Sequence, residues 1–416
     1  MTALPDDPDP LVPIPAWAAA DAAATRFLEG HRPELIAFRR HLHAHPELSY
    51  AERETTELVG ARLAAAGLRP RVLPGGCGLV CDIGDPTSGP LVALRADLDA
   101  LAMDDQKDVA YRSKRPGVAH ACGHDVHTTV VLGAALTLAE RWAAGDRVGA
   151  VRVIFEPAEE VTPSGAITVI ADGALEGVSA IYGVHCDPKL DAGHIGVRTG
   201  PITAATDHVE LVLRGPGGHT ARPQLTVDLV AVAGRLASDL PAAARRHAAG
   251  LGEVLLVFGM LHAGEAANVI PTQAVLKGTM RTHERLAWDE GEAILRAALA
   301  DALDGSGAEA EVRYVRGTPP VVNDAAATDL VGAVGAAVLG TDAVTPAPLS
   351  YGGDSFAWYL DRLPGSYVRL GVHDPSWSDR LDLHSGAFDV DERAIDVGVR
   401  VLVATAEATI ERALGS

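Results

Sequence analysis

The sequence of 416 residues contains only four cysteines and no long uninterrupted run of apolar residues. Four scattered cysteines are too few for the disulfide framework that small secreted domains use. A membrane-spanning helix needs about 20 consecutive apolar residues, and no segment approaches that length. The first residues, MTALPDDPDPLVPIP, lack the basic start and apolar stretch of a signal peptide. We therefore expect a cytoplasmic protein.

Basic residues are also scarce, with 35 Lys and Arg against 55 Asp and Glu, which gives a net charge of −20. The acidic residues are spread along the chain, and such an excess favours solubility. Nucleic acids and anionic membranes are bound by clusters of Lys and Arg. The charge balance therefore argues against both as partners.

Apolar residues are plentiful, and 416 residues exceed the size at which a single core normally keeps growing. Continuous apolar runs at 91–95, 151–155 and 180–185, separated by helical patterns, predict a mostly parallel α/β sheet. After Gly200 the strands alternate and follow a β-α-β-β-α-β order, which is the ferredoxin-like α+β arrangement. We predict a flexible leader at 1–15, a catalytic domain at 16–201 and 317–416, and an inserted domain at 202–316.

Several polar side chains with metal-binding capacity follow the predicted buried strands. Each has a structural interpretation on its own, because a lone cysteine usually packs in a core and adjacent glutamates usually face solvent. Ligands of open α/β sheets bind at the carboxyl ends of the strands, so these side chains are expected to converge. The expected cluster contains Asp97, Cys122, His124, Glu159, Glu160, His185 and His384.

The residue types of this cluster indicate a metal site. Gly123 allows the backbone between Cys122 and His124 to turn so that both side chains face one cavity. Thiolate and imidazole suit zinc, while imidazole and carboxylate also suit manganese or cobalt. Five ligands exceed one tetrahedral site, so two ions about 3.5–4 Å apart are expected. Glu159, next to the ligand Glu160, is then the candidate general base for an attacking water.

Ten motifs occur in order between about residues 34 and 400, namely FRRHLHAHPELSYAERET, ALRADLDAL, HACGHDVHT, FEPAEEVTPSGA, GVHCDP, PGGHTARP, ANVIP, GTMRT, GGDSFAWY and LHSGAFDVDE. In these motifs the chain resembles the M20 metallopeptidases, in the branch of aminoacylases, hippurate hydrolases and auxin-conjugate hydrolases. The resemblance implies hydrolysis of the amide bond of N-acyl amino acids or small peptide-like conjugates. It also implies a catalytic domain of the zinc-aminopeptidase type and an inserted lid or dimerisation domain, and hence a homodimer.

The resemblance assigns roles to individual residues. It implies that Cys122, His124, Glu160, His185 and His384 bind two divalent metal ions and that Glu159 is the general base. Arg95 stands where the wider family has a histidine ligand, so His124 is expected to replace that ligand and Asp97 to orient one.

In the inserted domain, the resemblance implies that His219 stabilises the oxyanion and that Asn268 and Arg281 contact the carboxylate of the substrate. Taken alone, His219 could be a simple loop histidine and Arg281 an exposed charge at a strand end. The family pattern Gly-x-Glu-Asp-Phe is replaced here by a run that contains Asp354 and Ser355, which leaves the substrate preference open.

Two other functions are compatible with the sequence. Cys122 could act as a nucleophile with His124 as its base, although residues two apart with glycine between them suit common ligation better. Alternatively, the chain could be a metal-loaded binding or scaffold protein without catalytic activity.

Overall fold

The computed structural model describes residues 15–145 and 149–415, so the predicted leader lies outside the described residues apart from Pro15. The chain divides into two compact units. The first comprises Met1–Arg198, Asp324–Ala347 and Arg362–Ser416, and the second Thr199–Asn323 and Pro348–Asp361. The second unit thus includes residues 348–361, which the sequence analysis placed in the catalytic domain. The reason is a long-range contact, because the amide of Ala204 hydrogen-bonds to the carbonyl oxygens of Ser350 and Gly352.

The first unit is built around an eight-stranded sheet with the order β1-β2-β4-β3-β5-β16-β6-β15. Its central strands β4, β3, β5 and β16 are parallel, which confirms the predicted mostly parallel α/β sheet. The strands are β1 (Arg71–Val72), β2 (Leu79–Gly84), β3 (Leu91–Asp97), β4 (Ala150–Glu156), β5 (Val178–Asp191), β6 (Ile195–Val197), β15 (Val344–Pro346) and β16 (Gly365–His373). The helices are α1 (Ala16–Ala44), α2 (Arg53–Ala65), α3 (His124–Ala143), α4 (Gly165–Ala171), α8 (Ala325–Leu339) and α10 (Arg393–Gly415).

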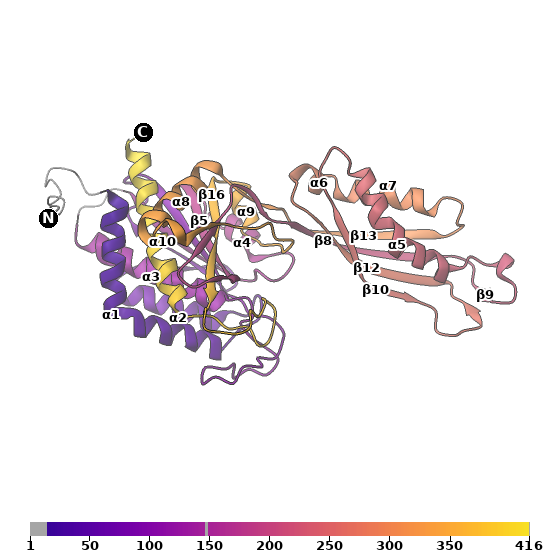
Figure 1. The fold of residues 1–416 in the computed structure, drawn as a ribbon, viewed down its shortest axis with the longest axis horizontal. Helices are drawn as coiled ribbons and strands as arrows, with labels where there is room; N and C mark the ends of the chain where they lie inside the picture. The colour runs from indigo at the N-terminus through magenta and orange to yellow at the C-terminus, as the bar shows by residue number, and fades with distance from the viewer. Residues whose placement is uncertain (1–14, 146–148, 416) are drawn as a thin grey trace, which may run out of the picture. The chain divides into compact units, whose positions relative to one another are not determined.

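One face of this sheet forms the main hydrophobic core. The helices α3 and α10 pack against the strands, and α1 packs against both helices (Figure 1). Alternate residues of each strand point toward these helices, as the pleat requires. They include Leu94 of β3, Val184 of β5 and Leu370 of β16, all of which belong to this core.

The opposite face of the same strands carries buried polar residues. Arg95 and Asp97 of β3, His185 of β5, and Tyr367 and Arg369 of β16 occupy the positions between the core residues, and each is at most 8% exposed. Burying polar groups is costly unless they find partners. This face is therefore the part of the fold where a functional site is expected.

The second unit contains a four-stranded antiparallel sheet with the order β10-β12-β8-β13. Helices α5 and α7 cover one face of it, which gives the predicted ferredoxin-like arrangement (Figure 1). The main elements are β8 (Ala205–Arg214), α5 (Leu229–His247), β10 (Leu255–Ala263), β12 (Gln273–Thr282), α7 (Gly291–Leu303) and β13 (Glu309–Thr318). Shorter elements are β7 (Gly200–Thr203), β9 (Gly218–His219), β11 (Val269–Ile270), α6 (Arg285–Asp289), β14 (Val321–Asn323) and α9 (Ala357–Leu360).

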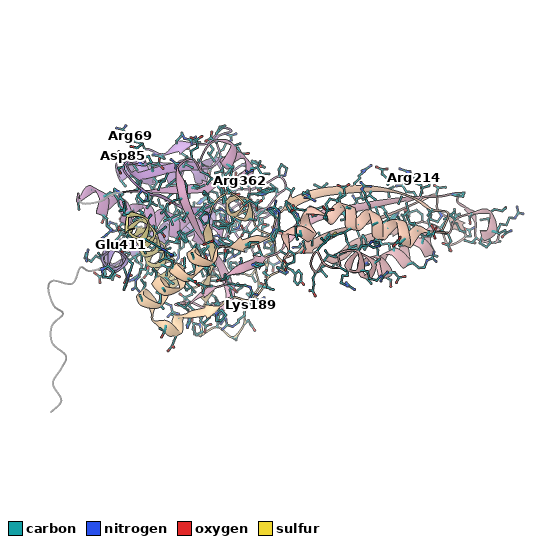
Figure 2. The ribbon with its side chains drawn as sticks, turned by 90° about the horizontal axis from the view of Figure 1, so that it is seen from above. Arg69, Asp85, Lys189, Arg214, Arg362 and Glu411 are labelled. Atoms are coloured by element: carbon teal, nitrogen blue, oxygen red, sulfur yellow. The ribbon has the colours of Figure 1, made fainter. Side chains whose placement is uncertain are left out.

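Charged side chains are distributed over the surfaces of both units. Arg69, Asp85 and Glu411 of the first unit and Arg214 of the second are all exposed (Figure 2). Within the described part of the chain, no helix combines the length and the apolar character needed to cross a membrane.

Candidate metal centre

The Cys122–His124 pair lies at the start of α3. Gly123 is the residue before the helix and has a φ of 90°, a left-handed conformation that favours glycine. A Cβ atom on Gly123 would lie 2.7 Å from Sγ of Cys186, so a larger residue would also clash. The turn leaves Cys122 and His124 buried, with 6% and 1% exposure.

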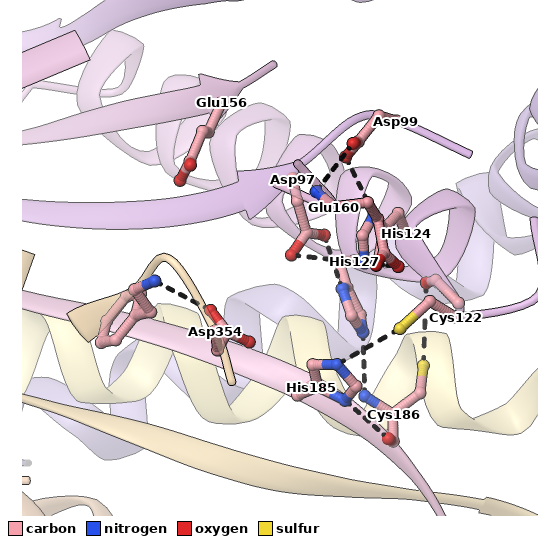
Figure 3. Close-up of polar contacts among 12 residues, drawn as sticks. Asp97, Asp99, Cys122, His124, His127, Glu156, Glu160, His185, Cys186 and Asp354 are labelled. Atoms are coloured by element: carbon pink, nitrogen blue, oxygen red, sulfur yellow. Dashed lines mark hydrogen bonds and ion pairs between the residues drawn. The ribbon is translucent and has the colours of Figure 1, made fainter. Parts of the chain in front are cut away.

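His185 approaches this pair from β5. Its Nε2 lies 3.6 Å from Sγ of Cys122, and its Nδ1 donates a hydrogen bond of 2.8 Å to the carbonyl oxygen of Cys186 (Figure 3). This bond fixes the tautomer in which Nε2 carries a free lone pair. Burial lowers the pKa of His185, and the charges of His127 and Arg369 lower it further. His185 is therefore held in the neutral form that binds metals.

His124 and Glu160 are both held by Asp99. Nδ1 of His124 donates to Oδ1 of Asp99 over 3.2 Å, and the amide of Glu160 donates to Oδ2 over 3.0 Å. Burial opposes ionisation of Asp99, but its hydrogen bond with His124 lowers its pKa overall. Nε2 of His124 and Oε1 of Glu160 are 3.8 Å apart, and both are buried without a hydrogen-bond partner among the described residues.

His384 reaches the same carboxylate from a loop. Its backbone has a φ of 59°, and its amide donates a hydrogen bond of 2.8 Å to the carbonyl oxygen of Ala121. Nε2 of His384 lies 3.4 Å from Oε1 of Glu160, and its side chain is 54% exposed. The contact with Glu160 raises the pKa of His384. Among the five expected ligands, His384 is thus the one most open to solvent.

The donor atoms fit metal ions. They form the groups Cys122–His124–His185 and Cys122–Glu160–His384, and within each group all donor atoms lie within 4.8 Å of one another. Two ligand atoms of one tetrahedral ion lie about 3.3–3.8 Å apart when the bonds are 2.0–2.3 Å. Within these groups, the separations of 3.4 Å between His384 and Glu160 and of 3.6 Å between His185 and Cys122 match this range. Cys122 belongs to both groups, so its sulfur could contribute to either of two ions.

Asp97 was expected to orient one of the metal ligands, and its hydrogen-bonded histidine partner is His127, which is not among the five expected ligands. Its Oδ1 accepts a hydrogen bond of 2.6 Å from Nδ1 of His127, and its Oδ2 accepts one of 2.6 Å from Arg95. Arg95 also binds Glu156, so the three charged groups form a buried cluster. Burial opposes ionisation of Asp97, but the charges of His124, His127 and Arg95 hold its pKa well below the usual range. Asp99, not Asp97, accepts the hydrogen bond of His124, which is one of the expected ligands.

The sequence analysis assigned no role to Asp99 or His127. Nε2 of His127 accepts a hydrogen bond of 2.8 Å from the amide of Cys186, so His127 ties α3 to β5 next to His185. A weak signal was present, because His127 lies one helical turn after His124 and Asp99 lies two residues after Asp97.

Glu159 lies in the loop after β4. It forms a group with His124 and Glu160 whose donor atoms lie within 4.8 Å of one another. The amide of the preceding residue, Ala158, donates a hydrogen bond of 2.7 Å to Oε1 of the buried Glu52. Burial raises the pKa of Glu52 to about 7. The carboxyl of Glu52 therefore anchors the loop that carries the paired glutamates.

The remaining predicted site residues lie in the second unit. The β9–β11 pairing places His219 opposite Val269, next to Asn268, and both His219 and Asn268 are exposed. Arg281 donates hydrogen bonds to Oγ1 of Thr206 and to the carbonyl oxygen of Tyr351. Burial lowers the pKa of Arg281.

Asp354 is also in the second unit, where it is buried. Its Oδ1 accepts a hydrogen bond of 2.8 Å from the amide of Phe356.

Comparison with known proteins identifies the family of the chain. The model of peptidase family M20/M25/M40 matches residues 93–408. The chain belongs to this family. The M20 protein is 37% identical to an N-acetylcysteine deacetylase of Bacillus subtilis over 378 residues, which cover 91% of this chain and 97% of that relative. A solved dinuclear metal-binding M20 peptidase of Bacillus subtilis is 34% identical with a TM-score of 0.78, covering 94% and 99% of the two chains.

A further relative is a longer protein. The M20 protein is 45% identical over 386 residues to a Rhodococcus jostii protein named putative glutamate–cysteine ligase 2-3. The matched residues cover 92% of this chain but only 48% of that relative. The M20 protein thus spans about half of that relative's length, and the ligase name describes the longer chain.

Proposed function

We propose that this M20-type amidohydrolase hydrolyses the amide bond of N-acyl amino acids or small peptide-like conjugates. The observation that carries the proposal is the convergence of thiol, imidazole and carboxylate groups at one edge of the sheet. Two of these atoms, Nε2 of His124 and Oε1 of Glu160, are buried without a hydrogen-bond partner among residues 15–145 and 149–415. The relatives support the substrate class, since one is named an N-acetylcysteine deacetylase.

Two divalent ions, zinc or manganese and with cobalt as a third candidate, fit the donor set. Cys122, His124, Glu160, His185 and His384 would hold them. Such ions polarise a scissile carbonyl and make a water molecule more acidic. Burial raises the pKa of the Cys122 thiol well above its usual value, and a cation bound beside it would favour the thiolate.

The side chains of the chain then move the proton and hold the substrate. Glu159, whose carboxylate belongs to one group with His124 and Glu160, would take the proton of the attacking water and pass it to the leaving amine. His219 would stabilise the oxyanion. Asn268 and Arg281 would contact the carboxylate of the amino acid, for which a guanidinium has the bidentate geometry.

The second unit also supports a homodimer. β10 is an edge strand of the four-stranded sheet, and edge strands offer unpaired backbone groups to a second chain. Val257, Met260 and Leu261 of β10 are exposed, at 51%, 41% and 45%. The cytoplasm remains the proposed compartment, in keeping with four free cysteines.

The cysteine-nucleophile alternative is less consistent with this geometry. A reactive cysteine needs a lowered pKa, whereas burial raises the pKa of Cys122. Iodoacetamide treatment of the metal-loaded protein tests this alternative, because a ligated and buried Cys122 should be protected and activity should persist.

The test of the proposed function is metal removal followed by reconstitution. The protein is dialysed against a chelator and assayed for product release from acyl-glycine, acyl-glutamate and aromatic conjugates, with N-acetyl-L-cysteine included. We expect activity to disappear with the metal and to return with Mn²⁺ or Zn²⁺. Full activity in the metal-free protein would refute the proposal, and no release from any substrate would favour the scaffold alternative.

A further inference from the structure

Arg369 lies beside the candidate metal centre on the polar face of the sheet. In the parallel pairing of β16 with β5, Arg369 is the partner of His185. Paired residues of adjacent strands project to the same face, so both side chains leave the sheet on the side opposite the α3–α10 core. Arg369 is only 8% exposed. A largely buried arginine side chain therefore lies next to a candidate metal ligand.

No hydrogen bond or ion pair joins this guanidinium to the part of the chain that the structure describes. Arg369 makes no side-chain hydrogen bond and no ion pair with any residue in the described ranges 15–145 and 149–415. On the other side of β16 its neighbour is Gly196, which contributes no side chain. Asp187, the diagonal neighbour on β5, accepts a hydrogen bond from the amide of Lys189 instead. No carboxylate of the surrounding strands neutralises this charge.

Other buried arginines of the same unit are neutralised. Arg39, which is 1% exposed, forms an ion pair of 2.7 Å with Asp125. Arg95, also 1% exposed, binds Asp97 and Glu156. A buried charge is normally paired, because leaving it unpaired costs free energy. Arg369, the strand partner of His185 on β16, departs from this pattern.

We infer that Arg369 binds a carboxylate group of the substrate beside His185. The planar guanidinium offers two parallel hydrogen bonds to a carboxylate, and burial strengthens them by excluding water. The carboxylate is either the α-carboxylate of the amino acid or one on the acyl group. The inference rests on the proposed function and adds a determinant of substrate choice to it.

The experiment measures binding without turnover. Calorimetry is performed on the metal-loaded full chain carrying Glu159→Gln, with and without Arg369→Met. The three probes are N-acetyl-L-alanine, N-succinyl-L-alaninamide and N-acetyl-L-alaninamide. They carry a carboxylate on the amino acid, on the acyl group, and on neither. Arg369→Lys is the matched control, because it keeps the positive charge but loses the bidentate geometry.

We expect Arg369→Met to weaken binding of one carboxylate probe by about ten- to a hundredfold, as for a hydrogen bond to a charged group, and to leave the uncharged probe unchanged. Arg369→Lys should cause a smaller loss. The probe that is affected identifies the source of the carboxylate. Equal effects on all three probes, or none on any, would overturn the inference.

Thermal unfolding of the same variants separates binding from a structural role. Arg369→Met should have a midpoint no lower than that of the parent, because the removed charge has no partner. A midpoint several degrees lower would also overturn the inference. Turnover is measured separately, on the protein that retains Glu159. If that protein does not hydrolyse the substrates, the proposed function fails, but the binding measurements on the Glu159→Gln variants still test the role of Arg369.

Discussion

Replacing Asp99 with asparagine tests how the metal ligands are held. The carboxylate of Asp99 accepts hydrogen bonds from three donors, namely Nδ1 of His124, the amide of Glu160 and Oγ of Ser49. Asparagine has only one acceptor oxygen, so its amide NH2 must face either Nδ1 of His124, at the place of Oδ1, or both the amide of Glu160 and Oγ of Ser49, at the place of Oδ2. If NH2 faces His124, Nδ1 must become an acceptor and the proton moves to Nε2, the atom needed for the metal.

The expected effect is a loss of metal affinity. Removing a partner of a metal ligand typically costs 10- to 100-fold in affinity. Because Asp99 serves both His124 and Glu160, we expect about 100-fold, or about 2.7 kcal/mol. Competition with a chromophoric chelator measures the affinity directly, and circular dichroism verifies the fold.

Ser49→Ala is the matched control for this prediction. It removes one hydrogen bond to Asp99, of 2.7 Å, but leaves the carboxylate in place for the other two donors. The metal affinity of the Ser49→Ala variant should fall by less than about tenfold, which is the scale of one ordinary hydrogen bond. If Asp99→Asn binds metal as tightly as the parent, or no more weakly than Ser49→Ala, the argument from the tautomer is wrong.

Two further predictions concern the loop after β4. Glu159→Gln should retain its metal, measured by elemental analysis, while turnover falls by about 10²- to 10⁴-fold because the proton acceptor is lost; unchanged turnover would remove Glu159 from its role. The pKa of Glu52 is raised to about 7, so its contribution to stability is fully present below pH about 4.5 and is lost as the pH rises to about 7. The free energy of unfolding lost in this way is about 3 kcal/mol. The thermal midpoint of Glu52→Gln should therefore decline less than that of the parent between these pH values. Parallel curves of midpoint against pH for the two proteins would contradict this prediction.

The sequence predicted the local elements of the site well, because their signals are local. A continuous apolar run predicted β3, and the turn expected at Gly123 is present, with Gly123 in the left-handed conformation directly before α3. The fold class followed from the order of strands and helices. The strand, the turn and the order of the elements depend on residues that are close together in the sequence, so the pattern of apolar residues is enough to predict them.

Features that depend on contacts between distant segments could not be predicted in this way. Whether Asp97 or Asp99 bonds to His124 depends on how β3 ends relative to α3, and the two aspartates are equivalent in a sequence pattern. The grouping of residues 348–361 with the second unit depends on hydrogen bonds to Ala204. That Arg369 has no carboxylate among its strand partners can be recognised only when those partners, His185 and Gly196, are known.

The donor atoms of the site come from segments of unequal rigidity. His185 lies within a long strand that is paired with β3 and β16, whereas Glu160 and His384 lie on loops. Central strands open only on near-global unfolding, while loops open at small cost in free energy. Two ions shared among these donors would therefore have different residence times. The one that depends on Glu160 and His384 would exchange with the solvent first, and a half-loaded protein would accumulate when metal is scarce.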